Sequence, residues 1–142
     1  AEFFAIMPPD NAGFVAIGAP ILFPQDGFAQ GNITRDPASL GSFTLNTIGT
    51  YRVDYYATVT ETAQLILAID TGSGPVEIPN SVVGRATGTS IISGFIFIQI
   101  TNPGSKVSLR NPLGNNIPIT ITPSSGGSRA ISARIIFTRI TI

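Results

Sequence analysis

The stretch from Ile91 to Thr101, IISGFIFIQIT, is apolar almost throughout and carries no charged side chain. Side chains of a β-strand alternate between its two faces, so the consecutive residues Phe95 to Ile98 would make both faces of a strand apolar. An antiparallel strand normally keeps one face in water. The run is too short to cross a membrane. We therefore expect another copy of the same chain to cover its second face.

Composition limits the classes of partner. Only 11% of the residues are charged, against about 25% in an ordinary globular protein, and eight basic residues balance eight acidic ones. Ser, Thr, Asn, Gln and Gly must then cover much of the surface, which suits a protein outside the cell or within an array. Without a basic stripe, we expect neither nucleic-acid binding nor insertion into a membrane. The length of 142 residues is that of one domain, residues 1–142, with a proper core.

The chain contains no Cys and no His. This excludes disulfides, thiolate nucleophiles, Ser-His-Asp triads and the usual zinc ligand sets. The eight acidic residues are scattered along the sequence and form no cluster of the EF-hand type. We therefore expect no catalytic residues, no cofactor and no metal. The chain begins at Ala1 without a Met and has no secretory signal or apolar membrane span, so it resembles a fragment or a processed form.

Strand signals recur every eight to fifteen residues between clusters of Gly, Pro and Asn, and helix signals are nearly absent. The clearest is Thr50 to Glu61, in which apolar and polar side chains alternate. Pro79 suggests an edge or a break. We predict an all-β sandwich or jelly roll of about ten strands. The candidate segments are 3–7, 14–17, 20–23, 32–35, 42–46, 50–61, 64–70, 76–83, 91–101, 106–110, 117–122 and 129–142.

The spacing of Phe43, Gly49, Tyr51, Val53 and Tyr55 resembles the C-terminal half of the C1q-domain signature, with Val53 where that family usually has Phe. In the N-terminal half of the signature, an Asp occupies the position expected to be aromatic or Leu. The resemblance is closer to the C-terminal domains of bacterial collagen-like spore-surface glycoproteins (the BclA type). The fragments that carry it are FFAIMPPDN, FPQDG, TIGTYRVDYYATVTETAQLILAID, VVGRATGTSIISG and NPLGNNIPITITPSSGG, which together cover most of the chain.

This resemblance implies a ten-stranded antiparallel jelly-roll sandwich of the C1q and tumour-necrosis-factor type. It also implies that three such domains pack about a threefold axis and cap a collagen-like triple helix on the exterior of a spore or cell (the exosporium). No Gly-X-Y repeat is present in this chain, so the stalk is expected from the resemblance alone. Self-association is expected from both lines of reasoning, whereas the number three comes from the family.

Apolar residues on the two-faced strands are our candidates for the trimer interface. They are Tyr55, Tyr56, Phe95, Phe97, Ile98, Ile135 and Phe137. The alternative is that one chain buries these residues within its own sandwich, and for Tyr55 a place in the core is at least as well supported. The expected function is a non-enzymatic trimerisation domain that caps a surface filament. The alternative function is a lectin-like or receptor-binding jelly roll, such as a phage or viral fibre knob, whose partner is a host receptor or glycan.

Overall fold

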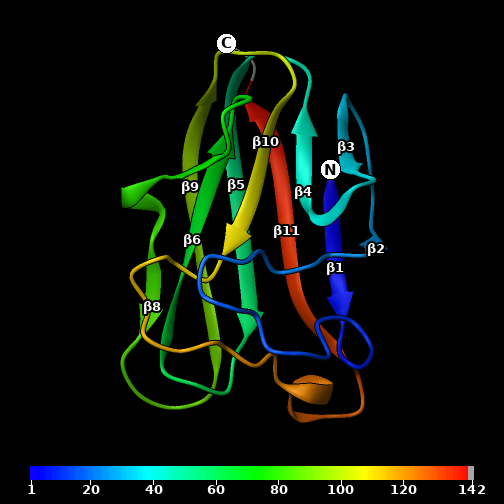
Figure 1. The fold of residues 1–142 in the computed structure, drawn as a ribbon. Coiled ribbons are helices and arrows are strands. Elements are labelled where there is room, and N and C mark those ends of the chain that lie inside the picture. The colour runs from blue at the N-terminus through cyan, green and yellow to red at the C-terminus, as the bar shows by residue number, and fades with distance from the viewer. Residues whose placement is uncertain (141–142) are drawn as a thin grey trace.

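The computed structural model describes residues 1–140 as two antiparallel sheets packed face to face (Figure 1). The first sheet has the strand order β2-β1-β11-β5-β9, and the second β3-β4-β10-β6-β7, with β8 paired to β6. The strands are β1 (Glu2–Ile6), β2 (Gln25–Asp26), β3 (Ile33–Asp36), β4 (Ser39–Leu45), β5 (Gly49–Thr58), β6 (Ala63–Asp70), β7 (Pro75–Glu77), β8 (Val83–Arg85), β9 (Ile91–Ile100), β10 (Ser105–Arg110) and β11 (Ile131–Ile140). The predicted all-β jelly-roll sandwich is confirmed.

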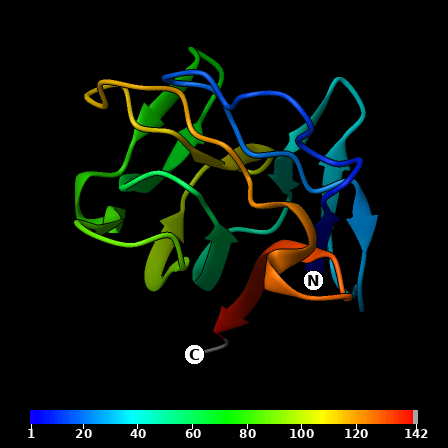
Figure 2. The same cartoon turned by 90° about the horizontal axis from the view of Figure 1, so that it is seen from below.

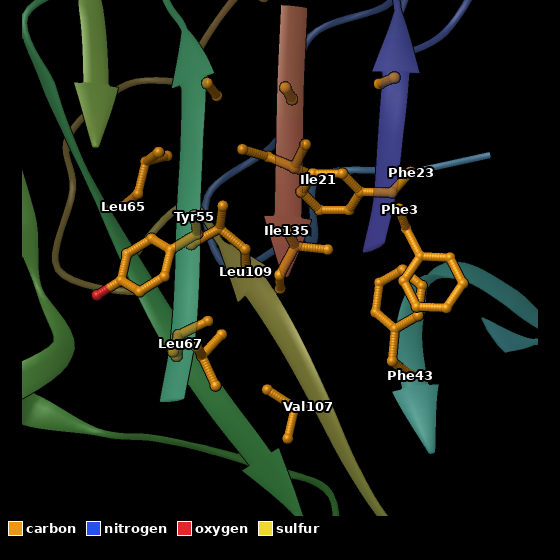
Figure 3. Packing of buried hydrophobic residues seen from close by; sticks show 14 of the residues in the cluster. Phe3, Ile21, Phe23, Phe43, Tyr55, Leu65, Leu67, Val107, Leu109 and Ile135 are labelled. Carbon is orange, nitrogen blue, oxygen red and sulfur yellow. The ribbon is translucent and has the colours of Figure 1, made fainter. Parts of the chain in front are cut away.

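The inward side chains of both sheets form one apolar core. Figure 3 shows Phe3 and Ile135 of the first sheet lying toward Phe43 and Leu109 of the second. The rings of Phe3 and Phe43 stack with their centroids 4.3 Å apart. Burial of a Phe or Leu side chain contributes about 1.5–3 kcal/mol, so this shared layer holds the two sheets together.

Three predicted strands are absent as strands. Residues 14–17, 20–23 and 117–122 form loops that make single bridges, Val15 to Ile119, Pro20 to Arg110 and Val59 to Ile121. These loops lie across the end of the sandwich, where the blue and orange segments run side by side in Figure 2. The buried Asn111 side chain joins them, because it donates to the carbonyl oxygens of Val15 and Ile117 at 3.1 and 3.2 Å. Their apolar residues fill the end of the core without running along a neighbouring strand.

Pro79 breaks the predicted strand 76–83 as expected. A 3-10 turn, Pro79–Ser81, separates β7 from β8, and a second, Pro123–Gly126, precedes β11. The last predicted strand begins two residues later than expected, at Ile131, and its final two residues lie outside the described part of the chain. No helix within residues 1–140 has the length and apolar character needed to span a bilayer.

Candidate self-association surface

The outward face of the first sheet carries exposed aromatic side chains. On β9, Phe95 is 61% exposed and Phe97 is 58% exposed, although they alternate with inward residues such as Ile98. The sequence prediction that this strand is apolar on both faces is therefore confirmed. One face belongs to the core, and the other is open.

Strand register shows how this face is built. Asp54 of β5 lies between Phe95 of β9 and Ile136 of β11, and Ile136 is paired in turn with Glu2 of β1. Cross-strand neighbours on one face of an antiparallel sheet lie within side-chain contact distance. We call this surface the outward face, and its residues are Glu2, Phe4, Arg52, Asp54, Tyr56, Ser93, Phe95, Phe97, Arg134, Ile136 and Thr138.

The first charged group on the outward face surrounds Phe95. The guanidinium of Arg52 lies over the Phe95 ring at 4.4 Å from its centroid. The same guanidinium binds the carboxylate of Asp54, with Nε at 3.2 and 3.1 Å from its two oxygens. This arrangement neutralises Arg52 within the chain and holds its guanidinium over the exposed ring.

The second charged group lies on the β1 side of the outward face. Arg134 Nη1 is 2.7 Å from Glu2 Oε2, and Arg134 Nε donates to the Tyr56 hydroxyl at 3.3 Å. Burial lowers the pKa of Arg134, but the hydrogen bonds to Tyr56 and Glu2 outweigh that effect and leave the pKa raised. The guanidinium therefore stays charged. Its carbon lies 5.7 Å from the centre of the Phe4 ring.

The two basic and two acidic residues of the outward face cancel, so the face has no net charge. Each charge already has its partner in the same chain. A second protein surface could cover this face without leaving an unpaired charge, which would be costly to bury. The outward face is not flat. A hollow of about 250 Å³ lies beside Phe95 and is lined in part by Tyr56, Ser93 and Arg134.

β9 also differs from the other edge strands. It is ten residues long, keeps one continuous register with β5 and contains neither Pro nor a charged residue. The edges β2 and β7 have two and three residues, and β7 contains Pro75 and Glu77. The edge β3 carries Arg35 and Asp36 and an irregular register between them. Short length, charge, Pro and bulges are the usual protections of an edge against pairing, and β9 lacks all of them.

The structure corrects four of the seven predicted interface residues. Ile135 is fully buried, and Phe137, Tyr55 and Ile98 are 2–5% exposed, all enclosed by their own chain. Burial raises the pKa of Tyr55 to about 12, and its hydroxyl donates to the Ser81 carbonyl oxygen. These side chains belong to the core because the strand period turns them inward. They offer no surface to a neighbour.

The other three, Tyr56, Phe95 and Phe97, lie on the outward face, where Tyr56 is half-buried. Sequence reasoning missed Phe4, Arg52 and Arg134 as members of the same surface. Alternation in Thr50 to Glu61 could have identified Arg52, but the partner strands follow from register, which the sequence does not state. Among residues 1–140, no group of three or more acidic side chains is placed to hold a metal ion.

No known protein family matches the chain in sequence, and no curated protein matches it. The globular domain of the zebrafish complement 1qA protein is similar in structure, with a TM-score of 0.63 and 17% sequence identity. The similarity covers 99% of this chain and 94% of the zebrafish chain. Similarity at this low identity establishes the fold, and the chain is therefore a jelly-roll sandwich of the C1q globular type.

Proposed function

We propose that this chain is a non-enzymatic structural module that self-associates into a homotrimer through the outward face. The observation that carries the proposal is the pair of exposed rings, Phe95 and Phe97, on a long edge strand without charge, Pro or a bulge. Single exposed apolar residues are ordinary on a protein surface. A column of aromatic residues beside half-buried Phe4 and Ile136, on a face without net charge, is the composition of a surface that another protein covers.

Energetics support the same conclusion. Burial of one Phe side chain contributes about 1.5–3 kcal/mol, so six rings in a ring of three subunits contribute about 9–18 kcal/mol. A trimer forms in two association steps, each of which costs about 4–15 kcal/mol in lost freedom. Phe95 and Phe97 therefore supply a free energy of the same order as that cost, and Phe4 and Ile136 add to it.

The number three and the biological setting rest on the family resemblance of the sequence. In that setting the module lies outside the cell, at the tip of a collagen-like filament on a spore or cell surface. Its mechanism is assembly. Association of three globular domains would hold three stalk chains side by side and raise their effective concentration, so that the collagen triple helix nucleates in register.

A fusion experiment tests this function. A collagen-like Gly-X-Y segment is joined to the chain, melted and cooled, and the return of the triple helix is followed by circular dichroism. We expect refolding to be faster with this chain than with the Gly-X-Y segment alone. We also expect the gain to disappear in the double variant Phe95→Ser and Phe97→Ser. Equal refolding rates for the fusion and the bare segment would contradict the proposed function.

A further inference from the structure

A second hollow, of about 570 Å³, is lined by residues of β6, of β8 and of the loop after β10. β8 lies at the lower left of the molecule in Figure 1. The lining of this hollow includes none of the residues of the outward face. The lining residues are Thr62, Ala63, Gln64, Gly84, Arg85, Ala86, Gly114, Asn115, Asn116 and Ile117. Self-association through the outward face therefore does not use these side chains.

Small residues give this hollow its depth. Ala63, Gly84, Ala86 and Gly114 supply no side chain beyond a methyl group. A Cβ atom at Gly84 would lie 3.0 Å from Gln64 Cγ, so a larger residue there would displace the Gln64 side chain. At Gly114 a Cβ atom would meet no atom within 4 Å, so this position borders open space.

The polar groups around the hollow are amides. Asn115 is held in place, because its Nδ2 donates to Asn111 Oδ1 at 2.5 Å and to the Gln64 carbonyl oxygen at 3.4 Å. The side chains of Gln64 and Asn116 are exposed and make no hydrogen bond within residues 1–140. Each free amide offers both a donor and an acceptor. A ligand can therefore replace water at these amides without breaking a hydrogen bond within residues 1–140.

Most N–H groups of the charged residue at this site are already engaged within the chain. Arg85 is the charged residue of the lining, and its guanidinium donates to the carbonyl oxygens of Gly88 at 3.0 Å and Val59 at 2.8 Å. It also donates to the carbonyl oxygens of Ser90 and Glu61. These bonds brace the loop before β9. The groups left for a ligand are therefore the neutral amides, the Thr62 hydroxyl and the apolar side chain of Ile117, which is 44% exposed.

We propose that this hollow binds a neutral saccharide. Hydroxyl groups of a pyranose ring both donate and accept hydrogen bonds, which matches side chains of Asn and Gln. The C–H face of the ring is apolar and fits against Ile117. The volume lies within the range of about 300–1,000 Å³ that is typical of small-ligand sites. Because four N–H groups of Arg85 already bind carbonyl oxygens of the chain, an acidic ligand would find few free donors for an ion pair, and we expect uncharged sugars to be preferred.

A glycan array of neutral and acidic oligosaccharides, probed with the whole chain, tests this proposal. The strongest neutral disaccharide is then titrated in solution, which separates recognition of a free sugar from recognition of a surface polysaccharide. Gly114→Tyr fills the hollow, and Gly127→Tyr is its matched control, because a Cβ atom at Gly127 also meets nothing within 4 Å. Asn116→Ala removes one free amide, with Asn80→Ala as its control at an exposed residue outside the lining.

We expect neutral glycans to bind, Gly114→Tyr to abolish binding and Asn116→Ala to weaken it about fivefold, the effect of one hydrogen bond. Both control variants should bind as the unchanged chain does. The proposal is overturned if no neutral glycan binds, if acidic glycans alone bind, or if Gly114→Tyr leaves the affinity unchanged. Light scattering of each variant reports self-association separately, so this proposal and the proposed function can fail independently.

Discussion

The outward faces of the two sheets are made from similar strands and differ in chemistry. On the second sheet, the outward side of β10 carries the charged, partly exposed residues Lys106 and Arg110, and Arg110 Nε donates to the buried Ser108 hydroxyl between them at 2.7 Å. On the first sheet, Phe95 and Phe97 occupy the corresponding outward positions of β9. Both sheets contribute inward side chains to the core, so folding alone does not require this difference between their outward faces. This is the difference expected if another protein surface covers the outward face of the first sheet, as we propose.

Replacing both exposed rings should have the largest effect on assembly. The double variant Phe95→Ser and Phe97→Ser gives the first sheet a polar face like that of the second. We expect each subunit to lose about 3–6 kcal/mol of association free energy, so that the variant is a folded monomer at micromolar concentration. Sedimentation velocity measures the result. Phe14→Ser is the control, because Phe14 is 75% exposed on a loop outside the outward face. Equal masses for the double variant and the control would contradict the assignment.

Substitutions at two neighbouring residues of β11 test the core and the outward face separately. Ile135 is fully buried, whereas Ile136 points outward and is half-buried. In the monomeric double variant, Ile135→Ala should lower the free energy of unfolding by about 2–5 kcal/mol, and Ile136→Ala should cost far less. In the otherwise unchanged chain, Ile136→Ala should instead weaken assembly. Urea titration and sedimentation measure the two effects, and a similar loss of folding stability for both variants would remove the distinction.

The ion pair on the outward face should contribute less. Glu2→Gln keeps the shape of the side chain but removes the charged partner of Arg134, which lies 2.7 Å away. We expect assembly to weaken by about 1–3 kcal/mol, because the guanidinium would be covered without its carboxylate. Concentration-dependent light scattering checks this. Tighter assembly of Glu2→Gln would show that this pair opposes association.

Removal of the ion pair between Lys106 and Asp36 on the second sheet should have the smallest effect, and its effect on the free energy of unfolding should depend on pH. Lys106 Nζ is 2.8 Å from Asp36 Oδ2. The hydrogen bond from Lys106 and another from the Ala38 backbone N–H lower the pKa of Asp36, and the same pair raises the pKa of Lys106. Stabilisation by Asp36 is therefore present above its unfolded pKa and is lost as the pH falls through its folded pKa.

The contribution of Lys106 is present below its unfolded pKa and is lost as the pH rises through its raised folded pKa. Lys106→Met is introduced into the Phe95→Ser and Phe97→Ser double variant, and its free energy of unfolding is compared with that of the double variant alone. We expect a small difference at neutral pH that disappears in acid. Urea unfolding at several pH values measures it. A difference that persists below the folded pKa of Asp36 would mean that the ion pair is not its source.

Much of the fold could be predicted from periodicity. Alternation located β5, and the apolar run located β9 within one residue of its observed end. Prediction failed for segments 14–17, 20–23 and 117–122, because an apolar residue in a loop that closes the core resembles one in a strand. Asn111, which joins two of these loops, gives no sign of that role in its local sequence.

The candidate surface was harder to predict than the fold. Counting apolar residues placed Ile135 and Phe137 with Phe95 and Phe97, although they lie on opposite sides of one sheet. The period of two separates them only once the inward face is known. Arg52 and Arg134 resemble ordinary surface charges in the sequence. Their role in covering aromatic rings depends on cross-strand register.

The mass of the unmodified chain in solution tests the central claim most directly. Sedimentation velocity over a dilution series gives that mass without any substitution. We predict one species of three times the 14.8 kDa of the chain, which persists at micromolar concentration. A species of 14.8 kDa throughout the series would contradict the account, because Phe95 and Phe97 would then remain in water on a stable monomer.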